Sequence, residues 1–367
     1  MHHAKHLESI PDLLYNRYIS FTVRSDNFMP AILLTVKNIL HAAVAVVMLI
    51  PILLTMGNAG DPDTPVETYP DNTNPYIAEY LAPDISAHRS GAGIAPQNTL
   101  MAFENIIEQA DTLGVDTLEF DVQITKDGEL VLLHDLTYDG TSNAAEAFGR
   151  KNVTVSSVTL EEAQALNMGE NFKLNGEYPY RGLRGSEIPY NLRVITCDEI
   201  IDYVEANSNS RKYNYVIEIK SIGINGLRAV DKLYSIITER NLQDRAIWST
   251  FAPDTSAYMK LKYPDISRTA DAVEAIQFYF YFRMNWELSD VSPSYVALQI
   301  PYGSSALDNI INLGTREMLN YAHKNNIAVQ YWTINSAEDV ITLTQNGADC
   351  IMTDYPQMAC EAVRSCQ

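Results

Sequence analysis

Cysteine is scarce in this sequence, and its few positions show no metal-binding pattern. The four cysteines of the 367-residue chain are Cys197, Cys350, Cys360 and Cys366. None lies in a Cys-x-x-Cys pair or at a zinc-ligand spacing from a histidine, so the sequence gives no indication of a zinc site. One or two disulfides are allowed if the protein is exported, but the spacing does not indicate which cysteines would pair.

Glycine and proline are also few, with 17 and 16 residues, whereas 46% of the side chains are hydrophobic. This composition excludes a disordered chain and is typical of a globular protein. The length fits either two medium-sized domains or one large α/β barrel, which commonly occupies ~250 residues or more as a single domain. We find no internal repeat.

Basic residues are few compared with acidic ones. The chain has 26 Lys and Arg against 46 Asp and Glu, a formal net charge of −20. The electrostatic field of this negative charge repels the phosphate backbone of DNA and RNA, so we expect no nucleic-acid partner. An enzyme for small phosphate esters would need a local cation, which a carboxylate-bound divalent metal supplies. Acidity also keeps secreted proteins soluble, and the net charge alone does not separate these two explanations.

A largely apolar run with no Asp, Glu, Lys or Arg covers residues 38–56, after Lys37 and before a polar stretch rich in proline. Its length and flanks predict an export signal or a single membrane anchor, with possible membrane association through this run. Met29 is an alternative start that would shorten the region before the run. We therefore divide the chain into a signal or anchor (1–60), a polar linker (61–80) and a catalytic domain (81–367), placed outside the cytoplasm.

From residue 84 onward, short apolar runs alternate with helical windows, which predicts a parallel sheet covered by helices, either a barrel or a doubly wound sheet. The expected strands are Ile85–His88, Thr117–Val122, Leu130–His134, Tyr215–Ile219, Ala246–Thr250, Ser267–Ala270, Tyr295–Ile300, Ile327–Thr333 and Cys350–Thr353. The expected helices are Thr99–Leu113, Leu160–Leu166, Cys197–Ala206, Leu227–Arg240, Thr315–Asn325 and Ala337–Asn346.

Nine strands are one more than an eight-stranded barrel holds. The step from Val122 to Leu130 is too short for a parallel crossover, so it predicts a hairpin. One strand of this hairpin, or Cys350–Thr353, must then lie outside the parallel register. Residues 137–193 have little strand signal, and we interpret them as an insertion over the carboxyl-terminal rim of the barrel, where loops shape specificity.

Polar side chains recur where these strands end. They are His88, Arg89, Glu119, Asp121, His134, Glu218 and Lys220. Residues two apart on a strand face the same side, so Glu119 and Asp121 point together. Charges inside a barrel are costly unless they bind a cation or each other.

These residue types suit phosphodiester cleavage. Three converging carboxylates, Glu119, Asp121 and Glu218, form an oxygen-rich site for a hard divalent cation, Mg²⁺ or Ca²⁺. Two histidines supply a general base and a general acid. Arg89 and Lys220 can neutralise phosphate oxygens. Each motif alone is weak, because a lone Glu-x-Asp is usually an exposed strand pattern and a lone His-Asp is usually a turn.

The ordered motifs resemble those of the glycerophosphodiester phosphodiesterases, a family of phospholipase C-like TIM barrels. Residues 86–135 resemble the opening motif, with His-Arg, a glycine loop, Pro-x-Asn-Thr, a Glu-x-Asp strand and His-Asp. Val216–Lys220 and 329–356 resemble the family's Glu-x-Lys strand and its closing Trp-Thr-x-Asn and Thr-Asp-x-Pro signatures. The resemblance covers about residues 84–358 and is weak between 137 and 193.

The resemblance implies a TIM-type (β/α)8 barrel in which His88 and His134 form the acid–base pair. It implies metal ligands at Glu119, Asp121 and Glu218, and phosphate contacts at Arg89 and Lys220. Asn98 and Trp332 are implied pocket residues, although core packing is an equally good interpretation of Trp332. One departure concerns the metal, because Gln97 replaces a glutamate usual in the family.

We expect hydrolysis of glycerophosphodiesters to glycerol 3-phosphate and an alcohol, with His88 as base and His134 as acid. One alternative is phospholipase C- or D-like cleavage of intact lipids, which an apolar rim would favour. Another is a barrel used only for binding. The aromatic run Phe278–Phe282 predicts either a helix packed on the barrel or a loop that contacts membrane or ligand. The sequence does not indicate an oligomeric state.

Overall fold

The computed structural model describes residues 60–61, 63–109, 114–208, 211–290, 293–303 and 313–367. The apolar run at residues 38–56, predicted as a signal or anchor, and the alternative start at Met29 lie outside these residues. None of the helices in the described ranges is both long and apolar enough to span a bilayer.

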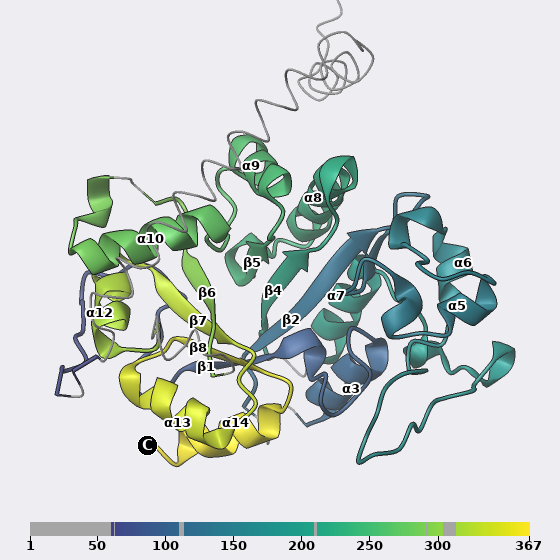
Figure 1. The fold of residues 1–367 in the computed structure, drawn as a ribbon, viewed down its shortest axis with the longest axis horizontal. Coiled ribbons are helices and arrows are strands. Elements are labelled where there is room, and N and C mark those ends of the chain that lie inside the picture. Colours follow the sequence, from purple (N-terminus) through teal and green to yellow (C-terminus); the bar gives the residue numbers. More distant parts are fainter. Residues whose placement is uncertain (1–59, 62, 110–113, 209–210, 291–292, 304–312) are drawn as a thin grey trace, which may run out of the picture. The chain divides into compact units, whose positions relative to one another are not determined.

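Parallel strands form a barrel at the centre of the described part of the chain (Figure 1). They are β1 (Asp84–Ala87), β2 (Thr117–Ile124), β4 (Asn214–Ile219), β5 (Ala246–Ser249), β6 (Ala297–Pro301), β7 (Ala328–Trp332) and β8 (Cys350–Thr353). Their order is β5-β4-β2-β1-β8-β7-β6. The two ends of this path are joined by Arg268, which bridges β5 at Trp248, and Thr269, which bridges β6 at Ala297.

This arrangement confirms the predicted α/β barrel. The eighth position in the ring of strands is filled by the segment predicted as the strand Ser267–Ala270. This segment makes only two parallel β-bridges. Strand β3 (Leu130–Leu132) pairs antiparallel with β2, so the predicted hairpin is confirmed and accounts for the ninth strand. Cys350–Thr353 lies in regular parallel register with β1.

Helices surround the strands in Figure 1. The longer ones are α3 (Leu100–Glu108), α7 (Cys197–Asn207), α8 (Gly223–Glu239), α9 (Pro253–Lys262), α10 (Ala272–Met284), α12 (Arg316–Lys324), α13 (Ala337–Asn346) and α14 (Pro356–Arg364). Several begin at a residue whose side-chain oxygen accepts a backbone N–H, as Thr196 does for α7. Such caps satisfy donors that have no partner within the helix.

Helix α10 contains the aromatic run Phe278–Phe282. Phe278 is 2% exposed, and its ring lies 5.4 Å from that of Tyr321 on α12. Phe282 contacts the same tyrosine at 5.6 Å. The run is therefore part of a helix packed on its neighbour, and not a loop.

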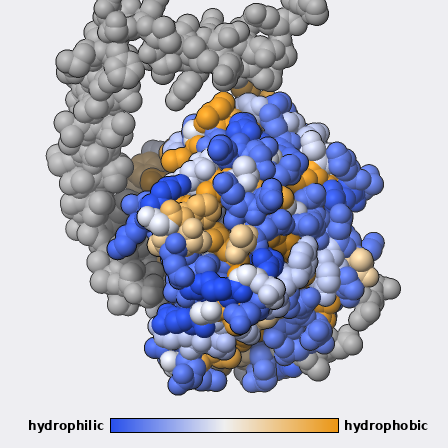
Figure 2. Space-filling model, turned by 90° about the vertical axis from the view of Figure 1, so that its right-hand side faces the viewer, coloured by the Kyte–Doolittle hydropathy of each residue, from blue (hydrophilic) through white to orange (hydrophobic). Residues whose placement is uncertain are grey.

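The predicted insertion at 137–193 folds as short helical pieces, among them α5 (Ala144–Ala147) and α6 (Leu160–Gln164), with no named strand in this range. Together with Val131 and Leu133 of the hairpin it forms a small hydrophobic core, which includes Tyr138, Val155 and Leu166. The insertion lies on the right-hand side of Figure 1, and Figure 2 shows that hydrophilic residues cover most of that face of the molecule.

Residues 63–80, expected to form a linker, are packed against the barrel. Tyr76 is 8% exposed and clusters with Val216 of β4, Ile247 of β5 and Ala297 of β6. The Ala78 N–H donates to Asp349 Oδ1 at 2.9 Å. These residues fold as part of the barrel because they cover apolar side chains that would otherwise face water.

All four cysteines are free thiols in the structure, and three of them are buried. The disulfides that the sequence allowed are therefore not formed.

Candidate active site

Three carboxylates meet inside the barrel near the carboxyl ends of β2 and β4. Glu119 and Asp121 share one face of β2, and the parallel register sets Asp121 opposite Glu218 of β4. One carboxylate oxygen from each residue lies within 4.8 Å of the others. Glu119 and Asp121 are only 3% and 1% exposed. The sequence predicted this convergence from the strand period and the position of each group.

The electrostatics of this carboxylate cluster favour a bound cation. Burial, together with the charge of Asp121, raises the pKa of Glu119 to about 7. Burial also raises the pKa of Glu218, against the opposing charge of Lys220. Lys220 Nζ forms an ion pair with Glu218 Oε1 at 2.6 Å. An oxygen-only set of mutually repelling carboxylates fits Mg²⁺ or Ca²⁺.

Asn98 holds Asp121 in place. Its Nδ2 donates to Asp121 Oδ2 at 2.9 Å, and its Oδ1 accepts the Asp121 N–H at 3.2 Å. Asn98 has a φ of 56°, a left-handed conformation that asparagine tolerates better than most residues. Asn98, predicted as a pocket residue, therefore contacts one of the three carboxylates directly.

Arg89 lies in a tight turn after β1. The 3₁₀ turn η2 (His88–Ser90) has left-handed φ values at Arg89 and Ser90, and Gly91 follows with a φ of 88°. This turn directs the Arg89 N–H to Glu119 Oε2 at 2.6 Å and its Nη1 to Gln97 Oε1 at 2.6 Å. Gln97, the departure from the family pattern, therefore contacts the arginine.

Lys220 touches two of the carboxylates, with Nζ 3.3 Å from Asp121 Oδ1 in addition to its contact with Glu218. Burial disfavours its charge, but Asp121 and Glu218 outweigh this effect and raise the pKa of Lys220. Lys220 is thus a fixed cation beside the cluster.

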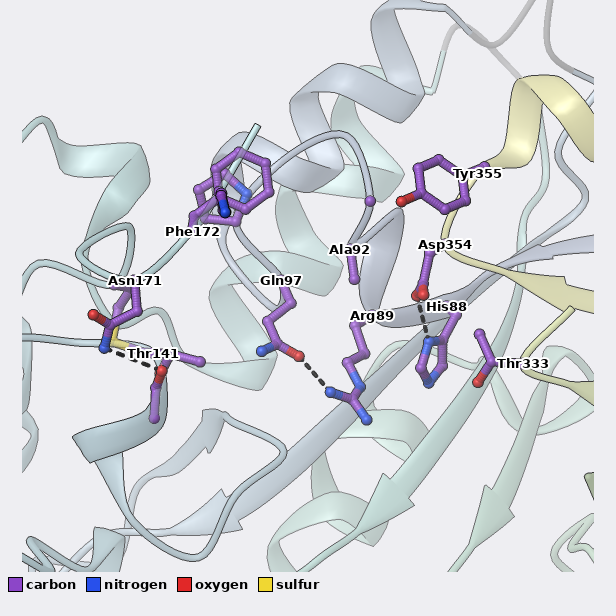
Figure 3. Close-up of a pocket in the computed structure, with 15 residues that line it drawn as sticks. His88, Arg89, Ala92, Gln97, Thr141, Asn171, Phe172, Thr333, Asp354 and Tyr355 are labelled. Atoms are coloured by element: carbon purple, nitrogen blue, oxygen red, sulfur yellow. Dashed lines mark hydrogen bonds and ion pairs between the residues drawn. The ribbon is translucent and has the colours of Figure 1, made fainter. Parts of the chain in front are cut away.

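His88 is held by a residue whose role sequence reasoning missed. His88 Nδ1 lies 2.7 Å from Asp354 Oδ1 (Figure 3). Asn335 Nδ2 donates to Asp354 Oδ2 at 2.7 Å. Burial lowers the pKa of His88, but the hydrogen bond to Asp354 and the charge of Glu119 outweigh it, so the net shift is upward. Asp354 and Asn335 belong to the closing signature in the sequence, which was the available signal.

His134 reaches the cluster through the hairpin. Because β3 runs back along β2, the Leu133 N–H donates to Asp121 O at 3.0 Å, which sets His134 at the level of the carboxylates. Its Nδ1 lies 2.8 Å from Asp135 Oδ1. Burial lowers the pKa of His134, and the charge of Asp121 and the hydrogen bond to Asp135 do not compensate. The two histidines are therefore shifted in opposite directions.

A cavity of about 500 Å³ opens from His88 toward the insertion. Figure 3 shows His88, Asp354 and Tyr355 on one side of it and Asn171 and Phe172 on the other. Its polar lining includes Gln97, Thr141 and Lys173 as well. The insertion thus forms one wall of a polar cavity beside His88.

Trp332 ends β7 and is partly buried. Its ring lies 6.0 Å from that of Phe251, and Lys220 Nζ lies 5.8 Å from the Phe251 ring. Trp332 therefore lies at the rim near the cluster, on a side of the rim where apolar rings gather.

Comparison with protein-family models matches residues 88–358 to the Glycerophosphoryl diester phosphodiesterase family. The chain belongs to this family. The match begins at His88 and extends past Asp354, so it contains all the site residues described above. It also establishes the class of enzyme, a phosphoric diester hydrolase.

Known relatives share most of their length with this chain. A glycerophosphodiester phosphodiesterase of Caldanaerobacter subterraneus is 30% identical over 76% of this chain and 97% of the relative. A solved structure from Silicibacter pomeroyi has a TM-score of 0.61 at 22% identity, covering 79% of this chain and 96% of that one. An Oleispira antarctica phosphodiesterase, solved with sn-glycerol-3-phosphate, has a TM-score of 0.56 at 20% identity, covering 77% and 97%. These two structures support the barrel fold.

Proposed function

We propose that this protein hydrolyses glycerophosphodiesters to glycerol 3-phosphate and an alcohol, using a divalent cation held by Glu119, Asp121 and Glu218. The observation that carries the proposal is the buried carboxylate cluster with a histidine on either side of it. Family membership, and the relative solved with glycerol 3-phosphate, support the same substrate class. When bound, the cation would neutralise charge on the phosphate and stabilise the transition state.

The chain's own cations complete phosphate binding. Arg89 extends from the turn after β1 toward the cluster, where its Nε lies 3.6 Å from Asp121 Oδ2. Its guanidinium offers donors to non-bridging phosphate oxygens. Lys220 lies at the same carboxylates and offsets their repulsion of an anionic substrate.

The roles of the two histidines follow from position and protonation. Sequence reasoning assigned the base to His88 and the acid to His134, and two observations support the opposite assignment. His88 lines the polar cavity, which suits a leaving alcohol, and its raised pKa favours the protonated form that an acid requires. His134 has a lowered pKa, which favours the neutral form that a base requires.

In this mechanism Asp354 holds His88 through Nδ1, so that Nε2 is free to protonate the departing alcohol. His134 takes the proton of the nucleophile, which is water or the 2-hydroxyl of the glycerol. With the glycerol hydroxyl, a cyclic phosphate forms first, and water then opens it while the histidines exchange roles.

Leaving-group chemistry tests this assignment. The His88→Ala variant should be slow by on the order of 10²–10⁴-fold on glycerophosphocholine, and much less impaired on an aryl ester whose leaving group needs no proton. His134→Ala should be slow on both esters. Rescue of His134→Ala alone would restore the original assignment, and hydrolysis that persists in excess chelator would exclude the divalent cation.

A further inference from the structure

A second cavity, of about 290 Å³, lies between residues 66–80 and the amino-terminal end of the barrel. The segment 66–80 forms one wall. The other wall is formed by His323, in the last turn of α12, and by Gly347, at which α13 ends. Because α12 and α13 each connect two parallel strands, their last turns lie at the end of the barrel opposite to the carboxylate cluster. This cavity is therefore separate from the active site.

His323 has one ring nitrogen without a partner. Its Nε2 lies 2.9 Å from Asp349 Oδ2, and the carboxylate of Asp349 also accepts the N–H groups of Val329 and Ala78. A carboxylate in this position is an acceptor, so Nε2 carries the proton and Nδ1 of the neutral histidine has a lone pair. Within the described ranges no group hydrogen-bonds to Nδ1, although His323 is only 6% exposed. The cavity thus contains a buried acceptor that is available to a ligand.

The charges around the cavity are negative. Glu67 and Glu79 line it with exposed side chains, and no Lys or Arg is among the described residues that form its walls. Lys324, which follows His323 in α12, is paired with Glu287 and does not line the cavity. The carboxyl-terminal turns of α12 and α13 add partial negative charge. Together these groups favour a cation and oppose a carboxylate or phosphate ligand.

Apolar side chains and two phenol rings complete the lining. They are Val66, Pro70, Ile77, Tyr69 and Tyr80. The apolar groups suit an alkyl chain, and the faces of tyrosine rings attract cations. The volume of the cavity is at the lower end of the range for small-molecule sites, so we expect a ligand of few heavy atoms.

We propose that this cavity binds a primary alkylammonium ion, a ligand that takes no part in the phosphodiesterase reaction. Its ammonium donates a hydrogen bond to His323 Nδ1 and is attracted by the carboxylates of Glu67 and Glu79, while its alkyl chain packs against the apolar part of the lining. Binding joins residues 66–80 to α12 and α13, so the ligand stabilises the folded protein. A quaternary ammonium has no N–H to donate and an alcohol has no charge, so both bind more weakly.

Calorimetric titration of the full chain with four compounds of similar size tests the class of ligand. We expect n-butylammonium to bind at least tenfold more tightly than tetramethylammonium, 1-butanol or butyrate. From ethylammonium to pentylammonium the affinity should rise roughly two- to fourfold per methylene, the upper value being that of full burial. In ¹⁵N NMR of histidine-labelled protein, n-butylammonium should shift the Nδ1 resonance of His323 toward that of a hydrogen-bonded nitrogen.

Variants of the lining test the place of binding. Val66→Phe fills the cavity without removing a polar group and should abolish binding. Glu67→Gln and Glu79→Gln remove exposed charges and should each weaken binding roughly two- to fivefold. The matched control is Asp71→Asn, which changes an exposed acid of the same segment that does not line the cavity, and it should leave the affinity unchanged. All four variants should keep the parent kcat/KM for glycerophosphocholine, because the cavity lies away from the active site.

Other outcomes overturn the inference. Equal affinity for 1-butanol and n-butylammonium, or tighter binding of butyrate, would exclude recognition of a cation. Undiminished binding by Val66→Phe would place the ligand outside the cavity. Loss of binding in Glu119→Gln would assign the ammonium to the carboxylate cluster instead. Absence of binding by every compound would remove the site altogether. None of these measurements depends on turnover, so each result leaves the proposed phosphodiesterase function to be judged by its own test.

Discussion

At the scale of single residues, the contact between His88 and Asp354 favours the protonated form of the histidine. It joins residues 266 positions apart in the chain. No local pattern reveals such a pair, which explains why the sequence identified His88 as catalytic but assigned no role to Asp354. The carboxylates were easier to predict, because a two-residue strand period places Glu119 and Asp121 together.

The variant Asp354→Asn tests this contact. Losing the carboxylate removes an interaction that raises the pKa of His88, so the pKa should fall. If protonated His88 is the acid, activity is lost as pH rises through that pKa. The alkaline limb of the kcat/KM profile should therefore move to lower pH, with a rate loss at pH 7 on the order of 10²-fold.

The matched control is Asp135→Asn, which removes the partner of His134. If His134 is the base, Asp135→Asn should move the acid limb of the profile and leave the alkaline limb in place. Movement of the alkaline limb by Asp135→Asn, with no effect of Asp354→Asn, would contradict both assignments.

Gln97 accepts a hydrogen bond from Arg89, and Gln97→Glu tests whether this contact affects how Arg89 binds phosphate. A carboxylate at the 2.6 Å contact with Arg89 Nη1 would compete with the phosphate for the guanidinium. We expect glycerol 3-phosphate to bind roughly three- to tenfold more weakly, the effect of about 1 kcal/mol, as measured by calorimetry. Gln97→Leu, which removes the acceptor without adding charge, is the control, and tighter binding by Gln97→Glu would refute the argument.

At the scale of elements, the sequence predicted most strands but fewer helices. Buried parallel strands are short, continuous apolar runs with clear ends, as in Tyr215–Ile219. Helices α9 and α14 were not predicted, and α10 was predicted only as one of two interpretations of Phe278–Phe282. In α10 apolar residues occur on all sides, with Phe278 its only buried residue, so no periodic stripe marks the helix. Strand Ser267–Ala270 has the composition of a strand, but only Arg268 and Thr269 make bridges.

The insertion shares a hydrophobic core with Val131 and Leu133 of the hairpin, distinct from the larger core of the barrel, and Leu166→Ala tests how independent the smaller core is. Leu166 is fully buried in that core, so its truncation should cost about 2–4 kcal/mol. We expect amide hydrogen exchange to accelerate within residues 137–194 and to remain unchanged in β4 to β8. Leu174→Ala, at a 39% exposed leucine of the same insertion, is the control. Equal acceleration throughout the barrel would mean that the two cores unfold together.

At the scale of the whole molecule, residues 63–80 act as a cover for the amino-terminal end of the barrel. A chain that starts at residue 62 keeps Tyr76 and its cluster, and should be as stable and active as the full chain. A chain that starts at Leu81 loses them, and should melt at a lower temperature. Tyr76→Ala in the full chain should alone cost about 3 kcal/mol in urea unfolding. Equal melting temperatures for both truncations would contradict a covering role.

The composition of residues 63–80 suggested a linker, because a polar segment rich in proline has no hydrophobic pattern that would predict packing against the barrel.

The same end of the barrel holds an unfavourable charge. Burial, and then the charges of Asp116 and Asp349, raise the pKa of Asp84 to about 6. The native state thus favours protonated Asp84, and this contribution to stability is present below about pH 4 and lost as pH rises through 6. Asp84→Asn should therefore be more stable than the parent protein by on the order of 1–2 kcal/mol at pH 8, with little difference at pH 4. A stability difference that is the same at both pH values would rule out titration of Asp84 as the cause.

The pairing of β1 with β8 has a consequence for synthesis on the ribosome. Strand β1 is made early, but its second neighbour, β8, ends at Thr353, so at ~5–20 residues per second one edge of β1 waits roughly 13–50 s for its partner. An unpaired strand edge invites pairing with other nascent chains. Strand β1 has only four residues, which makes it a poor template for such pairing. The same delay keeps Asp354 from His88, so the proposed acid gains the partner that raises its pKa only when the last strand closes the ring.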